Sequence, residues 1–358
     1  MSTQLLDMTG DTQLVSLDDR AGTDISKARD FDDVMNMAGF DFDTERVPVN
    51  TPEGHEVPGH FIIRRGDTKQ PFAVMRKRYT PIPMDEMFRP FHDVVTKNGA
   101  TYESAGLING GRKAWITAVL PDNFKVGNNP DDKFKKRIAA LASNDGSARN
   151  AYFSLAHRIV CNNQIRAILQ AASASDYSMS HTKNWKDKLM DAEIAFMMAV
   201  SALEEFEKHA EHLSTLPMTS DQCRTFATEL FPDPDRTLKP KELAGKTERE
   251  IKFLQEQLAK KETSSKLVNR REAIVDLFTD GVGNRGLNRL DAMNAMTEFF
   301  NHHNNSKKLE KEGSRAAERR LASNLFGGAN DIAMRRGKDI LLNTKTFKKT
   351  KPVVHATN

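Results

Sequence analysis

The chain has few cysteines and no long apolar run. Only Cys161 and Cys223 occur among 358 residues. Two cysteines without a CxxC pair form neither a disulfide framework nor a zinc motif. No window reaches the roughly 18 consecutive apolar residues of a membrane span, and the first residues lack the basic start and apolar stretch of a secretion signal. These absences predict a cytoplasmic protein in a reducing compartment, without membrane contact.

Nucleotide-binding motifs are also missing. No glycine-rich loop matches a Walker or dinucleotide pattern, because GVGNRG at residues 281–286 follows a predicted helix rather than a strand. Glu298 and His302, four residues apart on a predicted helix, could share a metal. The order Glu before His differs from the His-Glu-x-x-His motif of metalloproteases. A histidine is also favourable at the carboxyl end of a helix without any metal. We therefore predict no cofactor, no metal site and no catalytic residue.

Charge is distributed unevenly along the chain. Residues 1–60 carry 4 basic and 13 acidic side chains, whereas residues 301–358 carry 13 basic and 5 acidic ones. A basic end permits contact with nucleic acid, although a solvated face or tail is the commoner cause of such asymmetry. The hydrophobic fraction of 38% and the charged fraction of 28% are typical of a globular protein.

The first half of the chain has the pattern of an antiparallel α+β domain. Residues 1–58 mix acidic residues with glycine, proline and isolated apolar residues, which predicts a mobile acidic arm. Over residues 59–163, short β-rich runs predict three hairpins, and NGG and NDG turns join the second and third. After the first hairpin, apolar residues at helical spacing predict a helix from Met84 to Asn98.

The second half is predicted to be mostly helical. It covers residues 164–345, with a proline-rich loop near 231–240, and a basic flexible tail follows over 346–358. From Trp185 to Leu213, apolar residues alternate in steps of four and three, which fits a helix packed within its own domain or a contact between subunits. Together the halves predict an α+β fold, an antiparallel β-hairpin domain with one helix followed by a mostly helical region.

The stretch HRIVCNN, residues 157–163, places a cysteine and two asparagines in an otherwise apolar run. Cys161 could act as a nucleophile beside a base or a cation, because the thiolate is the reactive form. A free cysteine at the end of a strand is more often buried and structural. We interpret Arg158, Cys161 and Asn163 as a corner between a strand and a helix, with the asparagines capping that helix.

Four stretches together resemble a known family. In order they are NDGS, HRIVCNN, DAMNAMTEFFNHH and AAERRLASNLFGGA. This order is similar to a family that phages and plasmids encode widely and whose shared domain has no assigned function. The resemblance covers roughly residues 50–345 and implies a mobile-element protein of the bacterial cytoplasm. The chain departs from the family pattern at Gln164, where threonine is usual, and at NRGLNRL, where a Trp-Gly pair is usual. The family brings no catalytic residues.

The arrangement of elements is also similar to another group. A hairpin, a helix and further antiparallel strands, followed by helices and a basic tail, resemble the core of phage single-strand annealing proteins. No diagnostic motif accompanies this likeness, so it remains an analogy of fold.

Basic residues gather in the first predicted hairpin. Residues 61–80 hold six basic side chains and one acidic one. Cations there could follow a phosphate backbone, and neighbouring aromatic rings could stack on bases. Basic edge strands also deter aggregation, which is the competing explanation. The predicted phosphate-binding residues are Arg64, Arg65, Arg76, Lys77, Arg78, Arg112 and Lys113, and the predicted stacking residues are Tyr79 and Trp115.

The sequence therefore predicts a non-enzymatic nucleic-acid-binding protein of a phage or other mobile element. Single-stranded DNA is the expected partner, in binding or annealing during recombination or replication, and the chain is expected to form a homo-oligomer. One alternative is an oligomeric protein-interaction factor that modulates a host or phage complex. Another is an enzyme that uses Cys161 or the Glu298 and His302 pair.

Overall fold

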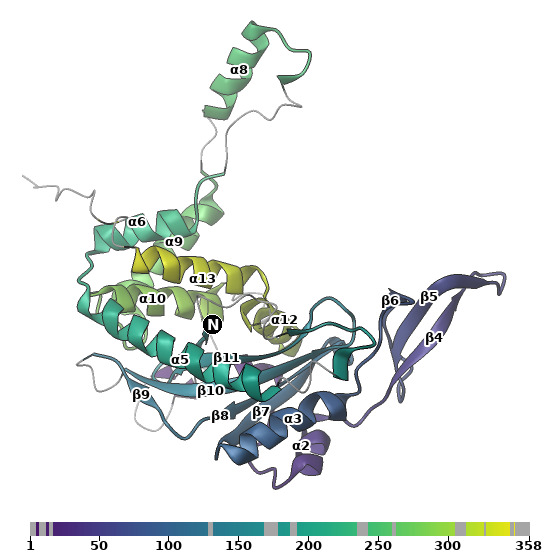
Figure 1. Ribbon diagram of the computed structural model, residues 1–358. Helices are drawn as coiled ribbons and strands as arrows, with labels where there is room; N and C mark the ends of the chain where they lie inside the picture. Colours follow the sequence, from purple (N-terminus) through teal and green to yellow (C-terminus); the bar gives the residue numbers. More distant parts are fainter. Residues whose placement is uncertain are drawn as a thin grey trace, which may run out of the picture.

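A computed structural model describes most of the chain (Figure 1). The described residues are 5–6, 12–13, 17–127, 132–167, 178–186, 192–234, 243–259, 263–304, 313–325, 327–343 and 347. At the centre lies an antiparallel sheet whose main path has the order β12-β11-β10-β8-β7-β3, with β13 beside β11 and β9 beside β10. Its strands are β3 (Thr23–Asp24), β7 (Thr101–Ile108), β8 (Lys113–Val119), β9 (Phe124–Lys125), β10 (Lys133–Ser143), β11 (Asn150–Arg158), β12 (Asn163–Ala167) and β13 (Ser178–Met179).

Helices cover both faces of this sheet. On one face, Trp115, Leu141 and Phe153 pack with Leu321 and Leu325 of α12 (Ser314–Leu325), which also contacts α1 (Leu17–Ala21). The other face packs against α2 (Phe31–Ala38), α3 (Met84–Lys97) and α5 (Ala192–Thr215). Because both faces are covered, β11 is buried throughout and β10 is buried from Arg137 onward, although both strands carry polar side chains.

The three predicted hairpins and the predicted helix are all present. They correspond to β5 (Glu56–Arg65) with β6 (Pro71–Arg76), β7 with β8, and β10 with β11, and α3 matches the predicted helix to within one residue. The described part of the heptad pattern lies in α5, where Ala199, Leu203 and Phe206 are buried and the helix lies against β11. This pattern therefore packs within its own chain. Leu189 of the pattern lies outside the described residues.

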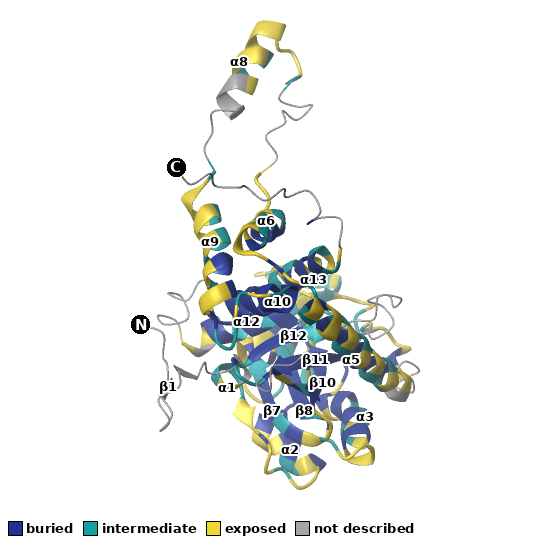
Figure 2. Cartoon of the chain, turned by 90° about the vertical axis from the view of Figure 1, so that its left-hand side faces the viewer, coloured by how far each residue is buried: buried dark blue, intermediate teal, exposed yellow. Residues whose placement is uncertain are grey.

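Further helices form a layer next to the sheet, and two of them, α10 and α13, contact β12 directly (Figure 2). They are α6 (Ser220–Leu230), α9 (Ser265–Asp280), α10 (Arg289–Glu298) with its π-helical extension Phe299–His303, and α13 (Ala329–Leu342). Every residue of α10 is buried, and Asn288 and Asp291 form a capping box at its start. Helix α10 is thus the centre of this layer.

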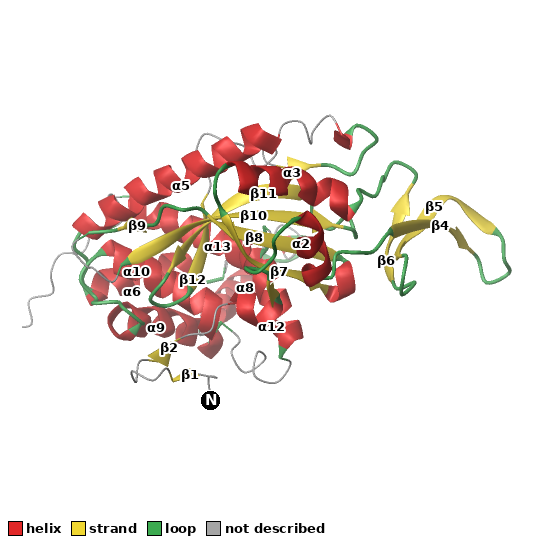
Figure 3. Cartoon of the chain, turned by 90° about the horizontal axis from the view of Figure 1, so that it is seen from below, coloured by secondary structure: helices red, strands yellow, loops and turns green. Residues whose placement is uncertain are grey.

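A three-stranded antiparallel sheet projects from the body (Figures 1 and 3). It consists of β4 (Thr44–Asn50), β5 and β6, in that order, and we call it the β-arm. The β4 to β5 ribbon extends beyond β6, because β6 pairs only with residues 60–64 of β5.

A second projection is α8 (Glu248–Ala259), which begins with a capping box of Thr247 and Glu250. A short pair of strands, β1 (Leu5–Leu6) and β2 (Thr12–Gln13), lies near the amino terminus. None of the helices in the described ranges has the length and apolar character required to cross a bilayer.

The structure differs from the predicted organisation in two places. Residues 31–50, predicted to belong to a mobile arm, form α2 and β4, because Phe31, Val34 and Phe40 are buried in the main core. The predicted boundary after residue 163 falls inside β12, and one core includes residues from both sides of it. Much of the predicted loop near 231–240, and all but Phe347 of the predicted tail over 346–358, lie outside the described residues.

Gly337 allows α13 to approach α10 closely. A Cβ atom at this position would lie 2.1 Å from Met296 Sδ, and Met296 is fully buried. We expect Gly337→Ala to lower the free energy of unfolding by about 1 to 3 kcal/mol through overpacking, although alanine is the better helix former. Urea denaturation measures this, with the exposed Ser201→Ala in α5 as control. A more stable Gly337→Ala variant would contradict the close approach.

Candidate nucleic-acid interface

The register of the β-arm separates its side chains into two faces. Residues opposite each other in an antiparallel pair lie on the same face. Val47, Ile62 and Val74 are opposite one another across β4, β5 and β6. The other face carries Ile63, which is fully buried, and Met75, which contacts the turn at Gly146. The β-arm thus rests on the body by one face and leaves the other open.

Two of the seven predicted phosphate-binding cations already have acidic partners. Arg64 Nε lies 2.7 Å from Glu45, and Arg65 Nε lies 2.7 Å from Asp67. Arg65 also stacks over the Phe42 ring at 4.0 Å and donates to Gly110 O at 3.2 Å. Arg65 therefore fixes the base of the β-arm to the turn between β7 and β8.

The other five cations are more accessible. Arg76, Lys77, Arg78 and Arg112 are exposed, and Lys113 is half-buried. None of the five forms an ion pair with a described residue. We call these residues the free cation group.

The free cation group surrounds one end of the central sheet. Tyr79, next to Arg78, donates from its hydroxyl to Ser143 O at 3.3 Å. On the other side of the same turn, Asn144 N donates to Arg112 O at 2.7 Å, and Lys113 pairs with Ser143 in the sheet. The turn between β10 and β11 thus joins the segment after β6 to the start of β8. Residues more than thirty positions apart in the sequence carry their positive charges to one region.

The two predicted stacking residues differ from expectation. Trp115 is only 1% exposed, and it packs where Gly22 and Gly106 leave space, so its ring cannot contact a base. Tyr79 is half-buried, and one face of its ring stacks on His181 with 4.6 Å between centroids. The prediction for Trp115 was wrong, because residues facing α12 are covered by that helix.

An acidic cleft lies beneath the base of the β-arm. It has a volume of about 950 Å³ and is lined partly by Phe40, Phe42 and Arg46. Its carboxylates would repel phosphate, so a bound nucleic acid is expected to pass over the open face instead. The acidic residues along the cleft are Asp41, Asp43, Glu45, Asp67 and Asp85.

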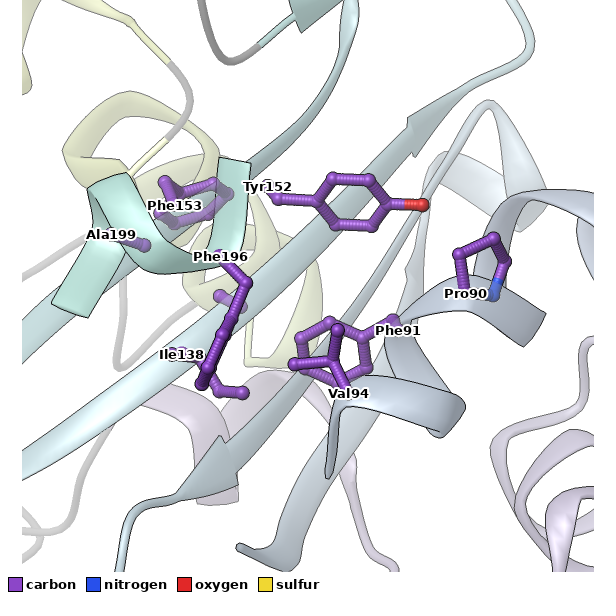
Figure 4. A pocket seen from close by; sticks show the side chains of 9 residues that line it. Pro90, Phe91, Val94, Ile138, Tyr152, Phe153, Phe196 and Ala199 are labelled. Atoms are coloured by element: carbon purple, nitrogen blue, oxygen red, sulfur yellow. The ribbon is translucent and has the colours of Figure 1, made fainter. Parts of the chain in front are cut away.

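A smaller cavity lies between α3, α5 and the sheet (Figure 4). Its volume is only about 10 Å³, and the rings of Phe91, Tyr152 and Phe196 line it. The Tyr152 hydroxyl donates to Met87 O at 2.9 Å. Such a small apolar space is a packing defect rather than a ligand site.

The predicted corner joins two strands and not a strand and a helix. β11 ends at Arg158 and β12 begins at Asn163, and Asn162 has a left-handed φ of 51° within the turn between them. The asparagines therefore form a turn and cap no helix. The prediction was wrong because the apolar run after Asn163 continues the sheet through its pairing with β11.

Arg158 is the centre of a buried network at this corner. The side chain is 1% exposed and forms an ion pair with Asp132, with Nε 2.6 Å from the carboxylate oxygen. Its Nη atoms donate to Val282 O at 3.1 Å, Gly283 O at 2.9 Å and Asn284 Oδ1 at 2.8 Å. Residues 282–284 connect α9 to α10. The guanidinium thus joins the sheet to the helical layer. The GVGNRG stretch contains the residues that accept these hydrogen bonds.

The groups proposed for catalysis are part of the same buried region. Burial raises the pKa of Cys161 to about 11, so its thiol is protonated at neutral pH. Glu298 is 2% exposed and accepts from Val282 N at 3.1 Å. Burial lowers the pKa of His302 to about 3, which keeps the ring neutral. These surroundings favour a structural role for all three.

The sequence interpretation missed the partners of this network. With its amide oriented to satisfy its neighbours, Asn163 donates to His302 Nε2 at 3.0 Å and to Cys161 O at 3.3 Å. Arg320 of α12 donates to the carbonyls of Asn301 and His302 at 3.0 and 2.9 Å. Three of the four stretches that carry the family resemblance therefore meet in one buried polar cluster. The order of these stretches along the chain indicated the family resemblance, but it did not predict that the stretches contact one another.

Removing the Arg158 charge tests the importance of the ion pair. We expect Arg158→Met to lower the free energy of unfolding by about 3 to 5 kcal/mol, because the buried Asp132 carboxylate loses its partner. Arg224→Met, which breaks an exposed pair with Glu272, should cost less than about 1 kcal/mol. Urea denaturation compares the two. Equal losses would contradict the role of Arg158, and Arg158→Met/Asp132→Leu should recover part of the loss.

His302 makes stability depend on pH. In the unfolded chain an imidazole gains a proton below about pH 6.5, whereas the folded ring stays neutral down to a pKa of about 3. Protonation in this range favours the unfolded state, so stability should fall as pH falls from about 6.5 to 3. The variant His302→Gln should show a smaller fall in urea midpoint over this range, with the exposed His55→Gln as the matched substitution. An unchanged slope in His302→Gln would oppose this assignment.

Comparison with known proteins gives one match. The sequence profile of DUF932, described as a domain of unknown function, matches residues 71–325. The match begins at the first residue of β6, so β4 and β5 lie outside it. No curated protein and no solved structure shows significant similarity to the chain. Because the match covers more than half of its residues, the chain belongs to the DUF932 family.

Proposed function

We propose that the protein binds single-stranded nucleic acid, most simply DNA, through the free cation group at the base of the β-arm. The observation that carries this proposal is that five cations without ionic partners among the described residues surround the turn between β10 and β11. Unpaired cations concentrated at one end of a sheet attract a polyanion, because binding releases the counterions of its phosphates.

The rest of the surface limits where the polyanion lies. The cleft at the base of the β-arm carries Asp41, Asp43 and Asp85, which oppose phosphate. Arg64 and Arg65 are engaged by Glu45 and Asp67, so they contribute less than the free cation group. Nucleic acid is therefore proposed to follow Arg76, Lys77, Arg78, Arg112 and Lys113.

The proposal includes a biological role, in the replication or recombination of a mobile element. The motif order resembles a family of phages and plasmids, which supports a role of the protein in the replication or recombination of a mobile element in a bacterial cytoplasm. The assembly of a homo-oligomer, which annealing of two strands would require, stays a prediction.

Charge reversal in the free cation group tests the proposal. We expect the double variant Arg76→Glu/Arg78→Glu to lose most of its affinity for a labelled oligothymidine. The salt dependence should also weaken, by about 0.7 in the slope of log K against log salt for each phosphate that the variant no longer neutralises. Fluorescence anisotropy at several salt concentrations measures both quantities.

The matched control makes the same change of charge elsewhere. Arg249→Glu/Lys252→Glu lies on the exposed surface of α8, which projects from the body in a different direction from the β-arm (Figure 1). This variant should bind as the wild type does. Absence of binding by the wild type at low salt, or equal losses in both variants, would overturn the proposal.

A second candidate function rests on α8. This helix projects from the body, its Phe253 is 59% exposed, and Ile251 and Leu254 are only half-buried. Isolated helices of this length are marginal in water, so a partner that covers these residues would stabilise the helix. This observation favours a protein-interaction factor. Failure of the wild type to bind nucleic acid would favour that function.

A further inference from the structure

The open face of the β-arm carries a compact apolar site. Val47, Ile62 and Val74 form a row across the three strands, which we call the aliphatic row. Val74 is 60% exposed, although valine is usually buried. Since neighbouring strands are about 4.8 Å apart, the aliphatic row is roughly 10 Å long. Val47 and Ile62 are half-buried, so Val74 supplies most of the accessible apolar surface of the row, and apolar surface of this kind on a projecting sheet indicates an interaction surface.

Polar rows flank the aliphatic row on the same face. On one side, Arg64 is opposite Glu45, and Lys69 Nζ also contacts Glu45 at 2.5 Å, so that two cations share one carboxylate. On the other side, His60 is opposite the exposed Arg76. The face therefore presents an apolar centre between two rims of net positive charge.

We infer that the aliphatic row contacts the unpaired bases of a single strand whose phosphates are held by Arg76 and its neighbours. This inference rests on the proposed function and specifies how the strand is bound. The bases of a duplex are stacked and paired, so their apolar faces cannot reach the row, whereas a single strand can turn its bases toward it. An apolar centre beside cations matches this chemistry, because bases are apolar on their faces and phosphates are anionic.

The inference predicts that the aliphatic row determines preference for single strands without contributing to the salt dependence. Ile62→Thr/Val74→Thr keeps β-branched side chains, which suit strands, and replaces apolar groups by hydroxyls. We expect about a tenfold loss of affinity for a labelled oligothymidine. Affinity for a duplex of the same length should not change, nor should the slope of log K against log salt.

The matched control is Ile194→Thr/Met197→Thr on α5. These residues are 57% and 67% exposed and belong to α5, which is not part of the β-arm. The control should bind both probes as the wild type does. Should Ile62→Thr/Val74→Thr lower the urea midpoint substantially, Val74→Thr alone replaces it, since the high exposure of Val74 makes that change mild.

Each other outcome opposes the inference in a distinct way. If Arg76→Glu/Arg78→Glu abolishes binding but Ile62→Thr/Val74→Thr keeps the ratio of single-strand to duplex affinity, the proposed function holds and this inference is wrong. If the wild type binds neither probe, both are wrong. If light scattering shows a dimer that Ile62→Thr/Val74→Thr dissociates, a second copy of the chain occupies the row instead.

Discussion

The charge of Arg158 is removed almost entirely from water, and the packing of the sheet against the helical layer depends on satisfying it. Desolvating a guanidinium costs several kcal/mol unless an ion pair and hydrogen bonds compensate. Asp132 supplies the opposite charge, and residues 282–284 supply carbonyl and amide oxygens. These acceptors are in place only when the α9 to α10 connection lies against the end of β11. The network thus requires one arrangement of the two layers.

This constraint gives a physical meaning to the family resemblance. The stretches HRIVCNN, DAMNAMTEFFNHH and AAERRLASNLFGGA meet around Arg158, Asn163, His302 and Arg320. Glu298 and Cys161 belong to the same buried region, where Glu298 accepts a hydrogen bond from Val282 N and burial raises the pKa of the Cys161 thiol. Large exposed apolar residues lie elsewhere, with Val74 on the β-arm and Phe253 on α8.

The β-arm combines stability at its base with accessibility along its open face. Ile63 and Met75 pack toward the body, and Arg65 joins the arm to the turn between β7 and β8. A three-stranded sheet with one supported face can be stable while the other remains open. Its cations differ in availability for a simple reason. Arg64 is opposite Glu45 and Arg65 lies two residues from Asp67, so both form ion pairs, whereas Arg76 is opposite His60 and forms none with a described residue.

The sequence alone determined the three hairpins, α3 and the start of α8, because turn residues, apolar spacing and capping boxes act between residues a few positions apart. It also indicated the cluster of basic residues near the first hairpin. Only the tertiary structure decided which cations are free, that Trp115 is covered by α12, and that the corner at Cys161 joins two strands. The reason is distance along the chain. The partner of Arg64 is 19 residues away, and the carbonyl of Val282 that binds Arg158 is 124 residues away, separations at which local patterns carry no information.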